Sequence, residues 1–212
     1  MSGQYYIYIP WNDADFIKSA NSWATIYKDA MTLQTLLEQD HNDPNPKFSH
    51  EYQQRKDEGN TLVLRKIPII SVHGSDVSKL ANILPADTLY VLGHCSAGSD
   101  AISNNNDEKL LAKPLIQQMI ADGVPQNIKE IKLWNCEGGK GTFFDDTCFG
   151  SLFYEESRKN TNFPSARITA YKSSLKTINK FGRKRGIKEE GMFFWAKEIE
   201  VRASSEAVHW PP

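Results

Sequence analysis

The sequence alternates short apolar runs with amphipathic stretches of helix length, and this alternation limits the fold more than any other feature. Thr88–Leu92, Glu130–Trp134 and Arg167–Tyr171 are runs of strand length. The first of them is uninterrupted, as expected of a strand covered on both faces. Between them, Glu108–Asp122 repeats apolar side chains at helical spacing. Alternating strands and helices imply right-handed crossovers, so we expect an α/β fold with a mainly parallel central sheet flanked by helices.

The chain is expected to form one structural domain. It has 212 residues, of which 40% are hydrophobic, enough for a packed core without metal or disulfide support. Residues 1–60 are predicted to be an N-terminal strand and helical extension packed on a core of residues 61–212. Gln4–Ile9 is the predicted strand, and Asn12 or Asp13 can cap the helix after it. Further predicted elements are strands at Thr61–Arg65 and Ile67–Val72, helices at Gly74–Leu84 and Phe149–Asn160, a polar loop at Ala97–Asp107, a hairpin at Leu175–Ile187, and a helix or strand at Phe193–Val201.

Charge and cysteine content exclude several classes of protein. Lys and Arg number 25 against 26 Asp and Glu, and a net charge of −1 argues against a globally basic nucleic-acid binder. No apolar run is long enough to span a membrane, and the N-terminus shows no secretory signal. Three cysteines do not make a disulfide framework, which favours a reducing compartment. We expect a cytoplasmic protein, or a secreted effector or toxin that acts in a host cytosol.

Two successive strands each end beside a reactive side chain. His94 follows the strand Thr88–Leu92, and Cys136 follows Glu130–Trp134, one strand–helix–strand unit later. Parallel strands carry their functional groups at their carboxyl ends, so the imidazole and the thiol are expected to face each other. A histidine beside a cysteine activates the thiol as a nucleophile. The backbone N–H groups of Cys95 and Cys136 are the expected oxyanion donors.

These motifs resemble a known family. The segments YVLGHCSAGSD, LIQQMIADGVPQNIKEIKLWNCEGG, SLFYEESRK and ARITAY look like the caspase-like (clan CD) cysteine peptidases, and most closely the peptidase domains of large bacterial toxins. The resemblance spans residues 61–190. It implies a three-layer caspase-like fold, a His94–Cys136 dyad and a thioester intermediate in peptide-bond hydrolysis, with no required cofactor. Cys95 stands where the family usually has glycine, so an extra side chain enters the cleft.

Two charged segments are candidates for ligand selection. Asp145 and Asp146 follow the nucleophile loop and would favour a basic residue before the scissile bond, but a solvated acidic loop is the simpler explanation of them. The second segment, residues 172–188, is rich in Lys and Arg. The resemblance implies that this segment is a basic flap that binds inositol hexakisphosphate as an allosteric ligand. A solvated hairpin is the alternative, and aromatic residues are too sparse to favour nucleic acid. The basic residues of this segment are Lys172, Lys176, Lys180, Arg183, Lys184, Arg185 and Lys188.

Other functions remain open. A glutamine-amidotransferase-like enzyme suits the turn Asn135–Gly139, but it needs a catalytic histidine after Cys136, where only His209 stands. A zinc site at His94, Cys95, Cys136 and Cys148 lacks the usual paired spacing, so no metal is expected. His73 is the one rival of His94. The main alternative is an inactive peptidase-like module that binds a peptide or an anionic ligand. In either case we expect a monomer that binds a protein or peptide.

Overall fold

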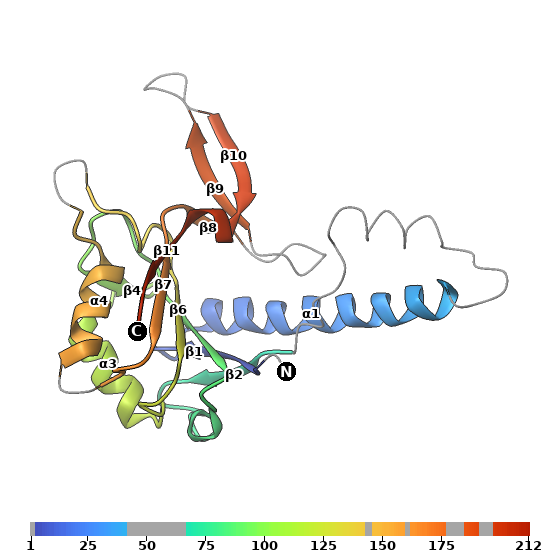
Figure 1. Cartoon of the computed structure of the whole chain (residues 1–212), viewed down its shortest axis with the longest axis horizontal. Coiled ribbons are helices and arrows are strands. Elements are labelled where there is room, and N and C mark those ends of the chain that lie inside the picture. The colour runs from blue at the N-terminus through green and yellow to red at the C-terminus, as the bar shows by residue number, and fades with distance from the viewer. Residues whose placement is uncertain (1–2, 42–66, 143–145, 160–161, 177–184, 191–196) are drawn as a thin grey trace.

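A six-stranded sheet lies at the centre of the molecule (Figure 1). The computed structural model describes residues 3–41, 67–142, 146–159, 162–176, 185–190 and 197–212. The strands of the sheet are β1 (Tyr5–Ile9), β2 (Ile69–Val72), β3 (Thr88–Leu92), β6 (Glu130–Trp134), β7 (Arg167–Tyr171) and β11 (Ala207–Trp210). Their order is β11-β7-β6-β3-β1-β2. All neighbours are parallel except β11, which pairs antiparallel with β7 at one edge.

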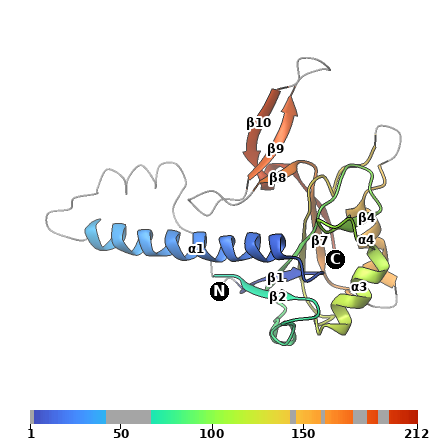
Figure 2. The same ribbon diagram turned by 180° about the vertical axis from the view of Figure 1, so that it is seen from behind.

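Helices cover both faces of this sheet (Figures 1 and 2). α1 (Ala14–His41) packs on one face, and α3 (Ala112–Ala121) and α4 (Phe149–Arg158) pack on the other. Successive strand residues point to opposite faces. In β3, Tyr90 therefore joins the core beneath α1, whereas Val91 joins the core beneath α3 and α4. The expected α/β class, with a mainly parallel sheet between two helical layers, is confirmed.

Two small sheets complete the described structure. Their strands are β4 (Ala101–Ser103) and β5 (Lys109–Leu111) in one, and β8 (Ser174–Lys176), β9 (Arg185–Glu190) and β10 (Lys197–Arg202) in the other. Figure 1 shows β9 and β10 reaching away from the central sheet. Leu175 pairs with Gly186 in an antiparallel register, as the predicted C-terminal hairpin requires. Residues 177–184, between β8 and β9, lie outside the described residues.

The segment 74–84 differs from the predicted helix. Its helical part is one short 3₁₀ turn, Leu80–Asn82. Val72 and Asp76 exchange two backbone hydrogen bonds of 3.1 Å, so the chain folds back on β2. Gly74 adopts φ of 72° within this turn, a conformation that glycine reaches without steric cost. The local backbone pairing therefore excludes a helix over most of the segment.

Several other boundaries also differ from the prediction. The helix expected from Glu108 begins at Ala112, because Lys109–Leu111 pairs with β4 instead. Ala97–Asp107, expected as a loop, contains β4 itself. The unassigned C-terminal segment supplies β10, and a second 3₁₀ turn, Ala203–Glu206, leads into β11. The predicted strand Thr61–Arg65 lies outside the described residues.

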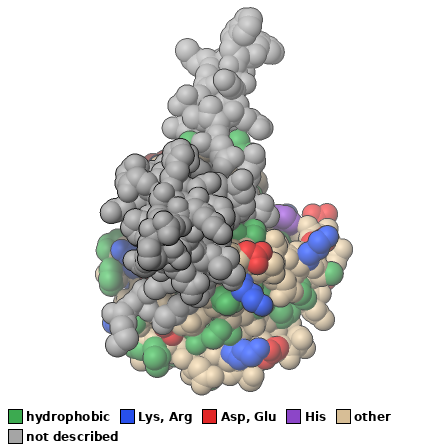
Figure 3. Space-filling view, turned by 90° about the vertical axis from the view of Figure 1, so that its right-hand side faces the viewer, with side chains coloured by type: hydrophobic (Ala, Val, Ile, Leu, Met, Phe, Trp, Pro, Cys, Tyr) green, Lys and Arg blue, Asp and Glu red, His purple; other side chains and the backbone are tan. Residues whose placement is uncertain are grey.

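On the face drawn in Figure 3, the described side chains form no separate area of one charge sign. Among its coloured side chains, basic and acidic groups are interspersed with apolar ones. In the part of the chain that the structure describes, no helix combines the length and the apolar character needed to cross a membrane.

Candidate active site

The sheet brings His94 and Cys136 to the same edge. β3 and β6 are adjacent and parallel, and Leu92 is in register with Trp134. Each reactive residue follows its strand by two positions, so both lie at the carboxyl edge, as expected. His94 is exposed and Cys136 is half-buried. Both line one cavity of about 120 Å³, together with Phe16, Ser19, Trp23, Leu92, Gly93, Trp134 and Leu175.

The imidazole of His94 is bonded to the amide of Asn105, which is bonded in turn to the carboxylate of Asp13. The side-chain oxygen of Asn105 lies 2.7 Å from Nε2 of His94. The Asn105 Nδ2 donates to both oxygens of Asp13, at 3.1 and 3.3 Å. Since Nδ2 faces the carboxylate, the group facing His94 is an acceptor, and Nε2 must carry the proton. In the neutral ring, Nδ1 is then left with its lone pair.

Asp13 also begins α1. Its Oδ1 accepts the backbone N–H groups of Asp15 at 2.9 Å and Phe16 at 3.1 Å, so it is the N-cap that the sequence suggests. Burial raises the pKa of its carboxyl, but hydrogen bonds from Phe16, Asn105 and Asp15 outweigh burial and hold the pKa below its usual range. A negative charge therefore stands behind Asn105 throughout the physiological pH range. The Phe16 ring packs 4.9 Å from the His94 ring, measured between centroids.

The thiol of Cys136 contacts the start of β8. Its Sγ accepts the backbone N–H of Leu175 at 3.3 Å. The turn after the thiol is anchored to the same region, because the Glu137 N–H donates to the Ser173 carbonyl at 3.1 Å. Glu137 adopts a positive φ of 52° in this turn. Among the described contacts, no hydrogen bond joins Sγ to the imidazole, so the two groups share a cavity without being bonded to each other.

Neither predicted oxyanion donor is engaged by the part of the chain that the structure describes. The backbone N–H groups of Cys95 and Cys136 donate to no acceptor within the described residues. The loops that carry them are joined by a 2.8 Å bond from the N–H of Gly98 to the carbonyl of Lys140. Gly98 has φ of 69°, and a Cβ there would meet the Thr142 side chain at 2.3 Å. The close approach of the two loops therefore depends on this glycine.

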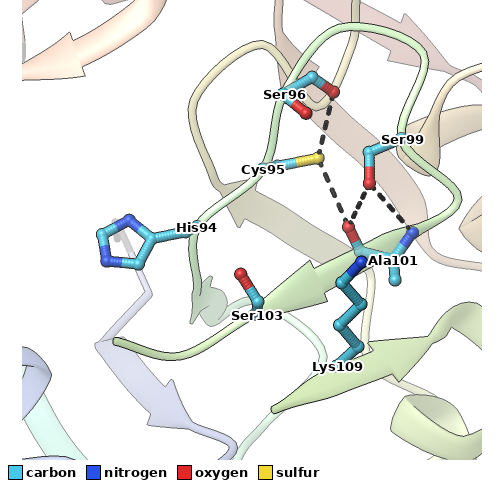
Figure 4. Close-up of a pocket in the computed structure, with 7 residues that line it drawn as sticks. All are labelled: His94, Cys95, Ser96, Ser99, Ala101, Ser103 and Lys109. Atoms are coloured by element: carbon cyan, nitrogen blue, oxygen red, sulfur yellow. Dashed lines mark hydrogen bonds between the residues drawn. The ribbon is translucent and has the colours of Figure 1, made fainter. Parts of the chain in front are cut away.

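The Cys95 side chain turns away from the thiol's cavity. Its Sγ contacts the carbonyl oxygens of Ser96 at 3.6 Å and Ala101 at 3.7 Å (Figure 4). It lines a second cavity of about 250 Å³, which His94 also lines. Burial raises the pKa of the Cys95 thiol to about 11, so this sulfur stays protonated at neutral pH. The side chain that replaces the family's usual glycine therefore lies in a cavity that Cys136 does not line.

Other predicted residues stand apart from the dyad. Asp146 is exposed and lines neither cavity, and Asp145 lies outside the described residues. The rival His73 is bonded through Nδ1 to Asp122 at 2.7 Å, and it too lines neither cavity. His209 lies in β11, bonded to Thr169. No group of three metal-ligating side chains occurs among the residues described.

The basic segment is only partly described. Lys172 follows β7 and is exposed. Lys176 belongs to β8, and Arg185 and Lys188 belong to β9. The remaining three, Lys180, Arg183 and Lys184, lie outside the described residues. Lys176, Arg185 and Lys188 thus share a sheet with Leu175, whose backbone N–H contacts the thiol, whereas Lys172 lies outside that sheet.

Three contributors to the site were not predicted as functional. Asp13 was predicted only as a cap, Asn105 fell within a loop, and Leu175 within a hairpin. No local motif marks these roles, because each depends on a contact between distant parts of the chain. A scan against models of known protein families finds no match, and no curated protein matches the chain.

Proposed function

We propose that this chain is a cysteine endopeptidase with a His94–Cys136 dyad. The observation that carries the proposal is the placement of both residues after adjacent, in-register parallel strands, where they line one cavity. A thiol and an imidazole at a sheet's carboxyl edge are the nucleophile and base of a thiol hydrolase. The N–H groups of Cys95 and Cys136, which have no acceptor among the described residues, supply the hydrogen bonds that stabilise the oxyanion of the tetrahedral intermediate.

The proposed mechanism begins at His94. With Nε2–H bonded to Asn105, Nδ1 takes the proton of the Cys136 thiol. The thiolate attacks the peptide carbonyl, and the two backbone N–H groups stabilise the oxyanion. The imidazolium then protonates the leaving amine, and a thioester remains on Cys136. Water, deprotonated by His94, hydrolyses the thioester and restores the thiol.

The cavity beside the thiol favours an apolar residue before the scissile bond. It is lined by Phe16, Trp23, Leu92, Trp134 and Leu175, and Ser19 is the one hydroxyl-bearing residue among the described ones that line it. An apolar side chain gains free energy by leaving water for such a surface, whereas a charged one loses its hydration. We therefore propose an apolar residue at this position, in place of the basic residue that Asp145 and Asp146 suggested.

We further propose regulation through the sheet β8–β10 in a bacterial toxin or effector. The family resemblance suggests inositol hexakisphosphate as the ligand of the basic segment. The contact that supports coupling is the 3.3 Å bond from the Leu175 N–H to Sγ. A ligand that shifts β8 changes the position and hydrogen bonding of the nucleophile.

Alkylation by iodoacetamide at pH 6 tests the dyad, because ordinary thiols react slowly there. Intact mass is followed for the wild type, Cys136→Ala and His94→Ala, with and without inositol hexakisphosphate. We expect rapid single labelling of the wild type, none of Cys136→Ala and at least about tenfold slower labelling of His94→Ala. His73→Ala is the matched control, since His73 also follows a strand of this sheet and should leave the rate unchanged. An unchanged rate in His94→Ala contradicts the proposal.

A second candidate is a peptidase-like module that binds without cutting. The observation in its favour is that Sγ bonds to Leu175 and Nε2 to Asn105, while no described bond joins thiol and imidazole. This candidate predicts that Cys136→Ala keeps the full biological effect of the protein. The endopeptidase predicts that the same variant binds peptide but loses that effect.

A further inference from the structure

His94 lines two cavities that differ in the side chains around them. The apolar cavity contains Cys136, whereas the second contains no atom of the nucleophile. The second cavity, of about 250 Å³, is lined by His94, Cys95, Ser96, Ser99, Ala101, Ser103 and Lys109. Figure 4 shows His94 at one side of this group and Lys109 at the other. We call it the polar cavity.

The polar cavity carries positive charge and hydroxyl groups. Lys109 supplies an ammonium group, and no ion pair to it occurs among the described residues. Its neighbour Glu108 is turned elsewhere, since its carboxylate accepts Nδ2 of Asn104 at 2.8 Å. Among the described residues, no carboxylate lines the cavity. An ammonium group beside hydroxyl donors is suited to a carboxylate, which accepts short charge-assisted hydrogen bonds.

Backbone pairing sets the position of the strand that bears Lys109 relative to the backbone of His94. His94 and Ser103 exchange two hydrogen bonds, of 2.8 Å from the His94 N–H and 2.9 Å from the Ser103 N–H. Ser103 in turn pairs with Lys109 across β4 and β5. The ammonium-bearing strand is thus held at a set position from His94. A group bound near Lys109 is therefore placed relative to the base that acts in the reaction.

The direction of the proposed reaction bears on which part of a substrate lies near the polar cavity. In the proposed function, on which this inference rests, His94 protonates the leaving amine, so the leaving segment lies on the imidazole's side of the thiol. We propose that the polar cavity binds an acidic side chain of the substrate, within the first two residues after the scissile bond. Lys109 is then a specificity-determining residue, and the enzyme cuts between an apolar residue and an acidic segment.

A peptide library tests this with the full chain. Digestion of a mixed library, read by mass spectrometry, gives the residues on both sides of each cut. We expect Asp and Glu to be enriched at one of the two positions after the cut. For matched peptides that differ only there, kcat/KM should be about fivefold to tenfold higher with Glu than with Lys. Lys109→Glu should invert that ratio, and Lys109→Met should bring it near one.

Lys113→Glu is the matched control. Lys113 is exposed on α3, four residues further along, and does not line the polar cavity. The substitution Lys113→Glu changes the net charge by the same amount as Lys109→Glu, and this variant should keep the preference for Glu. An unchanged preference in Lys109→Glu overturns the inference. The alkylation experiment separates the two levels, because His94-dependent labelling with charge-blind cleavage refutes the polar subsite alone, whereas His94-independent labelling refutes the endopeptidase.

Discussion

Asn105 connects the imidazole of His94 to the carboxylate of Asp13 through the two ends of one amide. An amide suits this position because it accepts on one side and donates on the other. An aspartate here would offer an acceptor to His94 but would oppose the Asp13 carboxylate. The choice of an amide therefore preserves both the tautomer and the buried charge behind it.

Replacing Asn105 by alanine should impair turnover more than binding. The ring of His94 loses the acceptor that orients it, so we expect kcat to fall about tenfold to hundredfold with little change in KM. Asn105→Asp should be at least as impaired, since two adjacent carboxylates raise the pKa of one of them. Steady-state kinetics across pH 5–9 measure both effects. Asn106→Ala, at an exposed neighbour, should match the wild type, and equal losses in both alanine variants would speak against the role of Asn105.

Cys95 should be inert under conditions in which Cys136 reacts. With a pKa raised to about 11, roughly one Cys95 thiol in ten thousand is ionised at pH 7. Peptide mapping after brief iodoacetamide treatment at pH 6–8 should therefore find the label on Cys136 and not on Cys95. Labelling of Cys95 should rise steeply only as the pH approaches 11. Equal labelling of the two cysteines at pH 7 would contradict this assignment.

At the scale of single elements, the stability of α1 depends on its N-cap, Asp13. Asp13→Ala removes the cap, and we expect a loss of about 0.5–2 kcal/mol in the free energy of unfolding. Because the pKa of Asp13 is lowered in the folded state, its contribution is complete above the unfolded value of about 4 and disappears as pH falls through the lower folded value. Urea unfolding at pH 7 and pH 2.5 measures the difference, which should shrink at the lower pH. Asn12→Ala, at an exposed neighbour, should show neither effect.

The contact between α4 and the sheet leaves no room for a side chain at Gly150. A Cβ there would lie 2.7 Å from the Trp210 ring and 2.9 Å from the Cβ of Ala170. Gly150→Ala would ordinarily stabilise a helix by about 1 kcal/mol, but here we expect a net loss of about 1–3 kcal/mol from overpacking. Thermal unfolding measures it. A Tm at or above that of the wild type would show that β11 shifts to make room for the added Cβ without loss of stability.

Several elements could be predicted because their signals are local. The apolar runs of β1, β3, β6 and β7 are bounded by turn residues, and the helix Ala112–Ala121 is strongly periodic. The strands β4, β5 and β11 are only three or four residues long and mixed in character, so no periodic signal distinguishes them from loops. Their strand character comes from partners elsewhere in the chain.

In the candidate site, too, the residues with a local sequence signal could be predicted, whereas those placed by distant contacts could not. His94 and Cys136 could be predicted because each follows a recognisable strand, and the adjacency of those strands is confirmed. The contact of Asn105 with Asp13 joins residues 92 positions apart, and the bond from Leu175 to the thiol joins residues 39 positions apart. Such contacts require the order of the strands. The polar cavity likewise depends on the pairing of Ser103 with Lys109, and the strands that carry these residues are too short to be predicted from the sequence.

For the molecule as a whole, the position of β1 inside the sheet has a consequence for biosynthesis. β1 pairs with β2 on one side and β3 on the other, and both are made later. At about 5–20 residues per second, this apolar strand spends about 3–12 s on the ribosome before residue 69 is added. Ribosome-associated chaperones have that interval in which to bind it, and codons that slow translation between β1 and β2 should lower the yield of native protein.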